Sequence, residues 1–173
     1  HLAQGQYGLV LRDERPVKFL RPGIHRIWKI DGNVRLRVFA ENEPLPEITG
    51  ELRDIIPAAE LLEANIDLNQ RAVLLRDGKP ERVLEPGHHA FWGKQNKLLT
   101  WKLDDLAFWA QPEVLAMLPA TWFQTIHLAP TERAVIYRDD KPKLFLRPGI
   151  HRVWMLDPMV AVRIFNVLEL APE

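Results

Sequence analysis

The chain lacks residue types on which several classes of protein depend. None of its 173 residues is cysteine, which excludes disulfide bonds, thiolate catalysis and cysteine-ligated zinc. It has no serine either, and therefore no G-x-S-x-G nucleophile motif. No apolar run approaches the roughly 18 residues that a membrane-spanning helix needs, and no signal peptide opens the sequence. Because it begins at His1 and ends in "LAPE", we expect a fragment of a longer cytoplasmic protein, any membrane association being supplied by other regions.

An excess of either charge is also missing. Lys+Arg and Asp+Glu both number 23, so the formal net charge is zero. A dedicated nucleic-acid-binding protein usually carries a basic excess, and we therefore expect no nucleic-acid partner. The nine glycines form no phosphate-binding loop, and there is no H-E-x-x-H or EF-hand pattern. The sequence thus predicts neither a cofactor nor an enzyme.

What the chain does contain is one stretch repeated three times. Residues 8–28, 72–92 and 134–154 align without a gap, and eight positions are identical in all three copies. The conserved core is Pro-Gly-x-His-x-x-Trp: Pro22, Gly23, His25 and Trp28; Pro86, Gly87, His89 and Trp92; Pro148, Gly149, His151 and Trp154. Agreement of this extent indicates internal duplication, and repeated units of this size must bury their apolar faces against one another.

Each copy has the pattern of a small antiparallel β unit. A short β-prone run such as "AVIY" is followed by Arg-Asp and Pro, which favour a turn, and then by a second run. Asp77-Gly78 suits a tight two-residue hairpin; the other two copies match it less well and leave a four-residue turn open. Pro-Gly makes the next turn, with glycine at a position of positive φ. A third strand carrying His and Trp on opposite faces and a fourth strand complete the unit.

Between the copies, the periodicity changes to that of short helices. Apolar residues at helical spacing lie around Leu52, Ile55 and Leu61, interrupted by Pro57, and a second such segment has Asp104 as a plausible N-cap and Pro112 as a break or restart. We therefore predict a mainly β (α+β) fold of three tandem antiparallel β units of about four strands. The units span residues 4–45, 67–103 and 127–170, and helical linkers span 46–66 and 104–126.

The repeated histidines and tryptophans allow two interpretations each. His25, His89 and His151 could bind one metal ion if the repeats met around a common axis, or each could hydrogen-bond the backbone beside its Pro-Gly turn. Arginine beside two of them disfavours a cation, so we favour the structural role and predict no metal. The tryptophans could be exposed binding residues, but a large aromatic in so small a unit is more often a core residue.

The third copy resembles a known family. "ERAVIYRDDKPKLFLRPGIHRVW" and the strand after it are similar to the opening strands of the stomatin/slipin (SPFH or band-7) family. The matching positions are Glu132, Arg133, Ala134, Val135, Arg138, Leu146, Pro148, Gly149, His151 and Val162. The earlier copies, at Gln4–Val38 and Asn69–Leu103, are similar to additional N-terminal repeats of some bacterial slipin-like proteins, and more distantly to the β repeats of major vault proteins.

This resemblance implies a non-enzymatic scaffold that forms oligomers and organises protein partners, commonly at membranes. The main SPFH body and the membrane segment of the family lie outside this sequence. We therefore expect association with protein partners or with further copies of the chain. Two alternatives remain: a module that binds a partner peptide by adding it as a strand to an exposed sheet edge, and a metal enzyme using the three repeated histidines.

Overall fold

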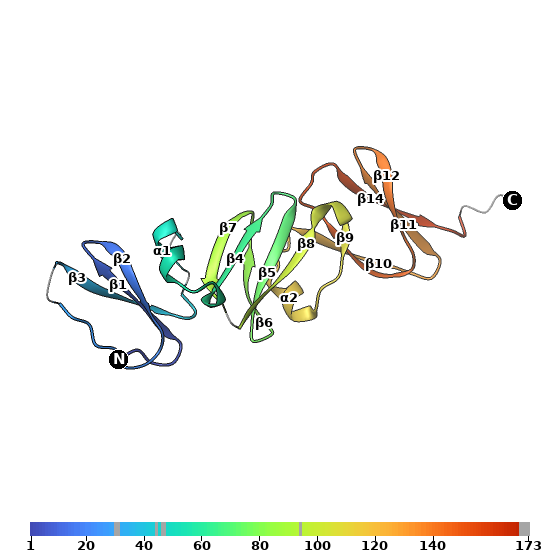
Figure 1. Ribbon diagram of the computed structural model, residues 1–173. Coiled ribbons are helices and arrows are strands. Elements are labelled where there is room, and N and C mark those ends of the chain that lie inside the picture. The colour runs from blue at the N-terminus through green and yellow to red at the C-terminus, as the bar shows by residue number, and fades with distance from the viewer. Residues whose placement is uncertain (30–31, 44, 46–47, 94, 170–173) are drawn as a thin grey trace. The chain divides into compact units, whose positions relative to one another are not determined.

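The computed structural model describes residues 1–29, 32–43, 45, 48–93 and 95–169 (Figure 1). Residues 30–31 and 44 of the first predicted repeat, 46–47 of the first linker, 94 of the second repeat and 170 of the third repeat lie outside this set. The described chain is mainly β, with several small antiparallel sheets and two short α-helices, which confirms the predicted fold class.

Each repeat contributes one three-stranded sheet with the same strand order. The first sheet contains β1 (Gln6–Arg12), β2 (Arg15–Leu20) and β3 (Val34–Ala40), in the order β2-β1-β3. The second contains β5 (Gln70–Arg76), β6 (Lys79–Leu84) and β8 (Asn96–Lys102), in the order β6-β5-β8. The third contains β11 (Glu132–Arg138), β12 (Lys141–Leu146) and β14 (Val160–Asn166), in the order β12-β11-β14. We call these the first, second and third sheets.

A two-residue turn joins the first two strands of each sheet, so the four-residue alternative does not occur. Both turn residues have positive φ in every copy: 49° and 64° at Asp13 and Glu14, and 51° and 59° at Asp139 and Asp140. Two positive φ angles in a two-residue loop match the right-handed twist of the flanking strands. The Asp-Gly copy does this without strain, whereas Glu14 and Asp140 hold a conformation that L-residues rarely adopt.

In the second and third repeats, the third strand does not join the sheet of its own repeat. In the second copy it is β7 (Gly87–Trp92), which pairs with β4 (Leu61–Ile66); in the third copy it is β13 (Gly149–Trp154), which pairs with β10 (Phe123–Leu128) and with the short β9 (Ala107–Phe108). Figure 1 shows β4 beside β7.

In the first copy the predicted third strand is wrong: residues 24–29, all described, form no strand, and only Leu2 bridges to Gly23. The physical reason is that a strand needs a pairing partner, and the described residues supply only this bridge. Leu2 is the counterpart of Leu128 at the end of β10, which pairs with Gly149 in the third copy.

The predicted linkers are only partly helical, and the second also contains the short strand β9 before its α-helix. Helix α1 (Gly50–Ile55) begins at the N-cap Thr49, and Pro57 separates it from the 3-10 turn η1 (Ala58–Glu60). Helix α2 (Pro112–Met117) begins at Pro112, as a restart at that proline predicts, but Asp104 lies inside the 3-10 turn η2 (Leu103–Asp105) and caps no α-helix. The last part of each predicted linker is a strand, β4 or β10, because it pairs with the third strand of the repeat that follows.

Contacts divide the chain into two compact units that do not follow the repeat boundaries. The first unit is His1–Asn65 with His88–Asn96, and the second is Ile66–Gly87 with Lys97–Glu173. The segment 88–96 belongs to the second repeat by sequence, yet it packs in the unit built on the first sheet. The reason is Trp92, whose side chain packs in the core of the first sheet.

Candidate functional site

The Pro-Gly-x-His part of the motif forms a closed turn. Gly23 and Gly149 have φ of 138° and 135°, a region that side chains with a Cβ rarely adopt. The histidine two residues later donates from Nε2 to the carbonyl oxygen of the arginine before Pro-Gly: His25 to Arg21 at 2.6 Å and His151 to Arg147 at 2.7 Å. The imidazole therefore satisfies a backbone acceptor, which is the structural role that we favoured.

The remaining motif histidine, His89, stacks on Phe91 with ring centroids 6.3 Å apart. Among the described residues, no group of three or more His, Asp or Glu side chains is arranged to hold a metal ion. The structure thus gives each repeated histidine a local contact.

Trp92, at the end of β7, lies in the core of the first unit. It is 1% exposed and sits against one face of the first sheet, which we call the outer face. Its ring stacks on Tyr7 at 4.6 Å and on Phe19 at 5.7 Å and tilts against Phe39 at 6.1 Å, all measured between ring centroids. Leu9 and helix α1, through Leu52, complete this cluster. The motif tryptophan of the second repeat is therefore a core residue of the first sheet.

Trp154, at the end of β13, repeats this arrangement one sheet further along the chain. It is 2% exposed and packs with Val73 of the second sheet and Val114 of α2. Phe108 stacks on its ring at 3.8 Å, and Trp101 of β8 meets it edge-on at 6.1 Å. The tryptophan of the third repeat is thus a core residue of the second sheet.

The residue before Trp154 packs on the other side of β13. Val153 is fully buried in a cluster with Ile136 of the third sheet and Ile126 of β10. Adjacent residues of a strand point to opposite faces, so β13 places valine in the core of its own repeat and tryptophan in the core of the preceding one. The sequence carried a sign of this: "IW", "FW" and "VW" put two large apolar residues side by side, which is typical of a strand buried on both faces.

Trp28 corrects our expectation that all three motif tryptophans are core residues. It is 79% exposed, although its neighbour Ile27 packs beside Val10 and Leu20 of its own sheet. The physical reason follows from the other two copies, in which the tryptophan covers the sheet of the preceding repeat. Trp28 covers no such sheet among the described residues, and its side chain is therefore solvated.

The outer face of the third sheet is the complementary case. Val135 pairs across the strands with Phe145 and Arg163, in the same register in which Leu9 pairs with Phe19 and Arg37 in the first sheet. Leu9 is 3% exposed, but Val135 is only half-buried and Phe145 is 56% exposed. An apolar face that is covered in the first two sheets is open here.

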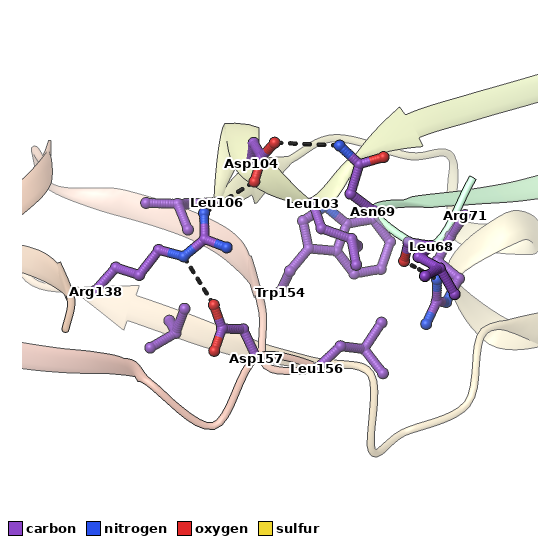
Figure 2. Close-up of a pocket in the computed structure, with 11 residues that line it drawn as sticks. Leu68, Asn69, Arg71, Leu103, Asp104, Leu106, Arg138, Trp154, Leu156 and Asp157 are labelled. Carbon is purple, nitrogen blue, oxygen red and sulfur yellow. Dashed lines mark hydrogen bonds and ion pairs between the residues drawn. The ribbon is translucent and has the colours of Figure 1, made fainter. Parts of the chain in front are cut away.

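A cavity of about 310 Å³ in the second unit lies beside Trp154 (Figure 2). Arg138 bridges two carboxylates at its edge, with N–O distances of 2.9 Å to Asp104 and 2.8 Å to Asp157, and Asn69 donates to Asp104 at 3.2 Å. The hydrogen bond that Arg138 donates lowers the pKa of Asp104, and the hydrogen bond that Asn69 donates lowers it further. The two carboxylates bound to Arg138 in turn raise the pKa of its guanidinium. The cation is thus neutralised by its neighbours, which suits a structural bridge rather than a substrate site.

The Arg-Asp pair of the third copy behaves as a turn and a bridge. Asp139 occupies the first position of the tight turn, while Arg138 forms the ion pairs described above. The two residues therefore have separate structural roles, as the turn prediction for Arg-Asp implies.

No protein-family model, no curated protein and no solved structure matches this chain. None of the helices formed by the described residues is long and apolar enough to cross a membrane.

Proposed function

We propose that this chain is a non-enzymatic scaffold region, similar to the N-terminal repeats of bacterial slipin-like proteins, which acts by association with protein partners and with copies of itself. The observation that carries the proposal is the burial of Trp92 and Trp154 against a neighbouring repeat. The second and third repeats each supply a core residue to the repeat before, so contact between repeats is part of this fold.

The polar groups of the motif support a structural role. The described motif histidines His25 and His151 bond to backbone carbonyls, and Arg138 is held by two carboxylates. Groups engaged in this way contribute to folding, and a catalytic role would require them to be released. The resemblance of the third copy to slipin sequences also favours a structural role.

Light scattering over a concentration series tests self-association. We expect the weight-average mass to rise with concentration above that of one chain, 20.1 kDa. A mass that stays at one chain over the whole series would contradict the self-association part of the proposal.

Strand addition of a partner peptide is the second candidate. The observation in its favour is β9, whose two residues Ala107 and Phe108 add to the edge of β13 as a short antiparallel strand. Partner binding that ends when a proline is placed in edge strand β14, while binding survives a proline in a surface loop, would favour this candidate. The metal-enzyme alternative is tested by metal analysis of protein purified without a His tag; absence of stoichiometric metal would eliminate it.

A further inference from the structure

The cavity beside Trp154 has an arginine on each of two sides, and only one of the two is neutralised. Its walls come from the second repeat, the second linker and the third repeat. Figure 2 shows Arg138 with Asp157 on one side and Arg71 on the opposite side, with Trp154 between them. Arg138 is held by its two carboxylates. Arg71 is the cation for which this bridge does not account.

Neutral groups hold Arg71 in place. Its Nη1 donates to the carbonyl oxygens of Leu68 and Gln70, at 3.1 and 2.6 Å. Its Cζ lies 5.1 Å from the centroid of the Trp122 ring, and its Nε is buried without a hydrogen-bond partner among the described residues. These contacts fix the guanidinium but bring no full negative charge to it.

The electrostatics of the cavity favour an anion beside Arg71. Burial lowers the pKa of Arg71, and the charge of Glu85 offsets this effect only in part. Within the described residues only Nη1 of Arg71 donates, which leaves Nη2 for a further acceptor. A carboxylate there would form a strong charge-assisted pair. On the opposite side, Asp104 and Asp157 repel an anion, so the Arg71 side is where a carboxylate fits.

The rest of the cavity suits a small apolar group. Leucine side chains and the Trp154 ring form its walls: Leu68, Leu103, Leu106 and Leu156. Its volume of about 310 Å³ lies at the lower end of the range for ligand pockets, roughly 300–1,000 Å³. The cavity therefore fits the end of a chain better than its middle.

One polar group in the wall favours a peptide over a fatty acid. Asn69 donates its amide N–H to Asp104 at 3.2 Å, and its backbone carbonyl accepts from Leu103 at 2.8 Å, so the side chain is fixed in orientation. Its amide oxygen remains to accept a hydrogen bond. A peptide has backbone N–H groups to donate there, whereas a fatty acid has none.

We propose that this cavity binds the C-terminus of a partner protein whose last residues are apolar. The terminal carboxylate pairs with Arg71, and an apolar side chain packs against Trp154. Capture of a C-terminal carboxylate is a recurring mode of peptide recognition. The inference rests on the partner-binding part of the proposed function and adds the chemistry by which the partner is recognised.

Two tripeptides that differ only at their C-terminus test the carboxylate. ¹⁵N-labelled protein is titrated with acetyl-Gly-Leu-Leu, as the free acid and as the amide, and NMR follows the backbone amides of Leu103 and Leu156. We expect the free acid to bind at least about tenfold more tightly, because the amide cannot form the charge-assisted pair with Arg71. Equal affinities for the two peptides, or no shift with either, would overturn the inference.

The third sheet offers a matched control for Arg71. Nη1 of Arg133 donates to the carbonyl oxygens of Pro130 and Glu132, at 2.9 and 2.7 Å, but Arg133 does not line this cavity. Arg71→Gln and Arg133→Gln therefore remove the same backbone contacts, and we expect similar falls in melting temperature. Only Arg71→Gln should lose the preference for the free acid. A preference that survives Arg71→Gln would contradict the inference.

Leu68→Glu keeps the test valid if Arg71→Gln does not fold. Leu68 lines the cavity but is 85% exposed, so its replacement leaves the core intact. The new carboxylate repels the free acid and leaves the amide unaffected. We expect the tenfold preference to disappear, and an unchanged preference would count against a carboxylate at Arg71.

Decanoate tests whether the carboxylate belongs to a peptide. It has an apolar chain but no N–H for Asn69, so we expect it to bind more weakly than the free-acid peptide. Binding as tight as that of the peptide would overturn the assignment to a protein C-terminus. If both peptides fail while the mass rises in light scattering, the inference fails and the scaffold function stands. Peptide binding by a chain that stays monomeric would support the site and contradict self-association alone.

Discussion

Truncation of the three motif tryptophans offers a controlled comparison within one chain. Trp28, Trp92 and Trp154 occupy the same motif position, but they are 79%, 1% and 2% exposed. Replacing each by alanine therefore makes the same chemical change in one solvated and two buried settings. We expect the two buried sites to lose stability and the exposed site to lose almost none.

The magnitude follows from the buried area. A tryptophan buries roughly 200 Å², which at about 25 cal/mol per Å² corresponds to about 5 kcal/mol. Within the described residues the indole nitrogens of Trp92 and Trp154 have no hydrogen-bond partner, a penalty of roughly 1–3 kcal/mol that truncation removes. We therefore expect Trp92→Ala and Trp154→Ala to lower the free energy of unfolding by about 2–4 kcal/mol, and Trp28→Ala by under about 0.5 kcal/mol.

Hydrogen exchange at low protein concentration is the assay that separates the two units. Trp92→Ala should reduce amide protection in residues 1–65 and 88–96, and Trp154→Ala in 66–87 and from 97 onward. Loss of protection in the sheet of the mutated residue's own repeat, with the preceding sheet unaffected, would refute the reasoning. So would a loss for Trp28→Ala comparable to that of the buried pair.

Three further outcomes are expected from local features. Asp140→Gly should raise the free energy of unfolding by about 0.5–1 kcal/mol in thermal melts, because φ of 59° suits glycine; no gain would show that Asp140 is unstrained there. His151→Ala should lower it by about 1 kcal/mol through loss of the bond to Arg147, and an unchanged melt would contradict that role. Because Arg138 lowers the folded-state pKa of Asp104, the pair stabilises the fold above the unfolded pKa of about 4, and this contribution is lost as pH falls through the lower folded value. Arg138→Met should therefore destabilise at pH 7 more than at pH 2 in urea titrations, and an equal loss at both would exclude the ion pair as the cause.

The sequence predicted the elements better than their partners. Asp77-Gly78, the Pro-Gly turns and the break at Pro57 are local signals, and the structure confirms a turn, positive φ at the motif glycines and a helix end at those places. Where β13 pairs is not local. Alternation in "IHRVW" indicates that the strand has two faces, but the sheet that meets Trp154 lies many residues away in the chain.

The residues of the candidate site could be predicted from the sequence, but the repeat into which each motif tryptophan packs could not. The motif positions were visible from the repeats, and the role of His25 and His151 at the turn followed from Pro-Gly chemistry. The exposure of Trp28 was not predictable from its own repeat, because the sheet that a motif tryptophan covers belongs to the repeat before it. The environment of a motif tryptophan therefore depends on which repeat carries it.

The alternation of Val153 and Trp154 also restricts where the chain can change length. In all three copies the tryptophan follows the motif glycine by five residues, from Gly149 to Trp154 in the third. One inserted residue in that stretch would turn the indole toward its own repeat and the valine toward the preceding one, and both cores would fail together. The spacing between copies differs by two residues, 64 from Gly8 to Ala72 and 62 from Ala72 to Ala134. The difference lies in the loop before the last strand of the sheet, because Val34 follows Trp28 by six residues and Asn96 follows Trp92 by four, so this protein varies in length outside the motif strand.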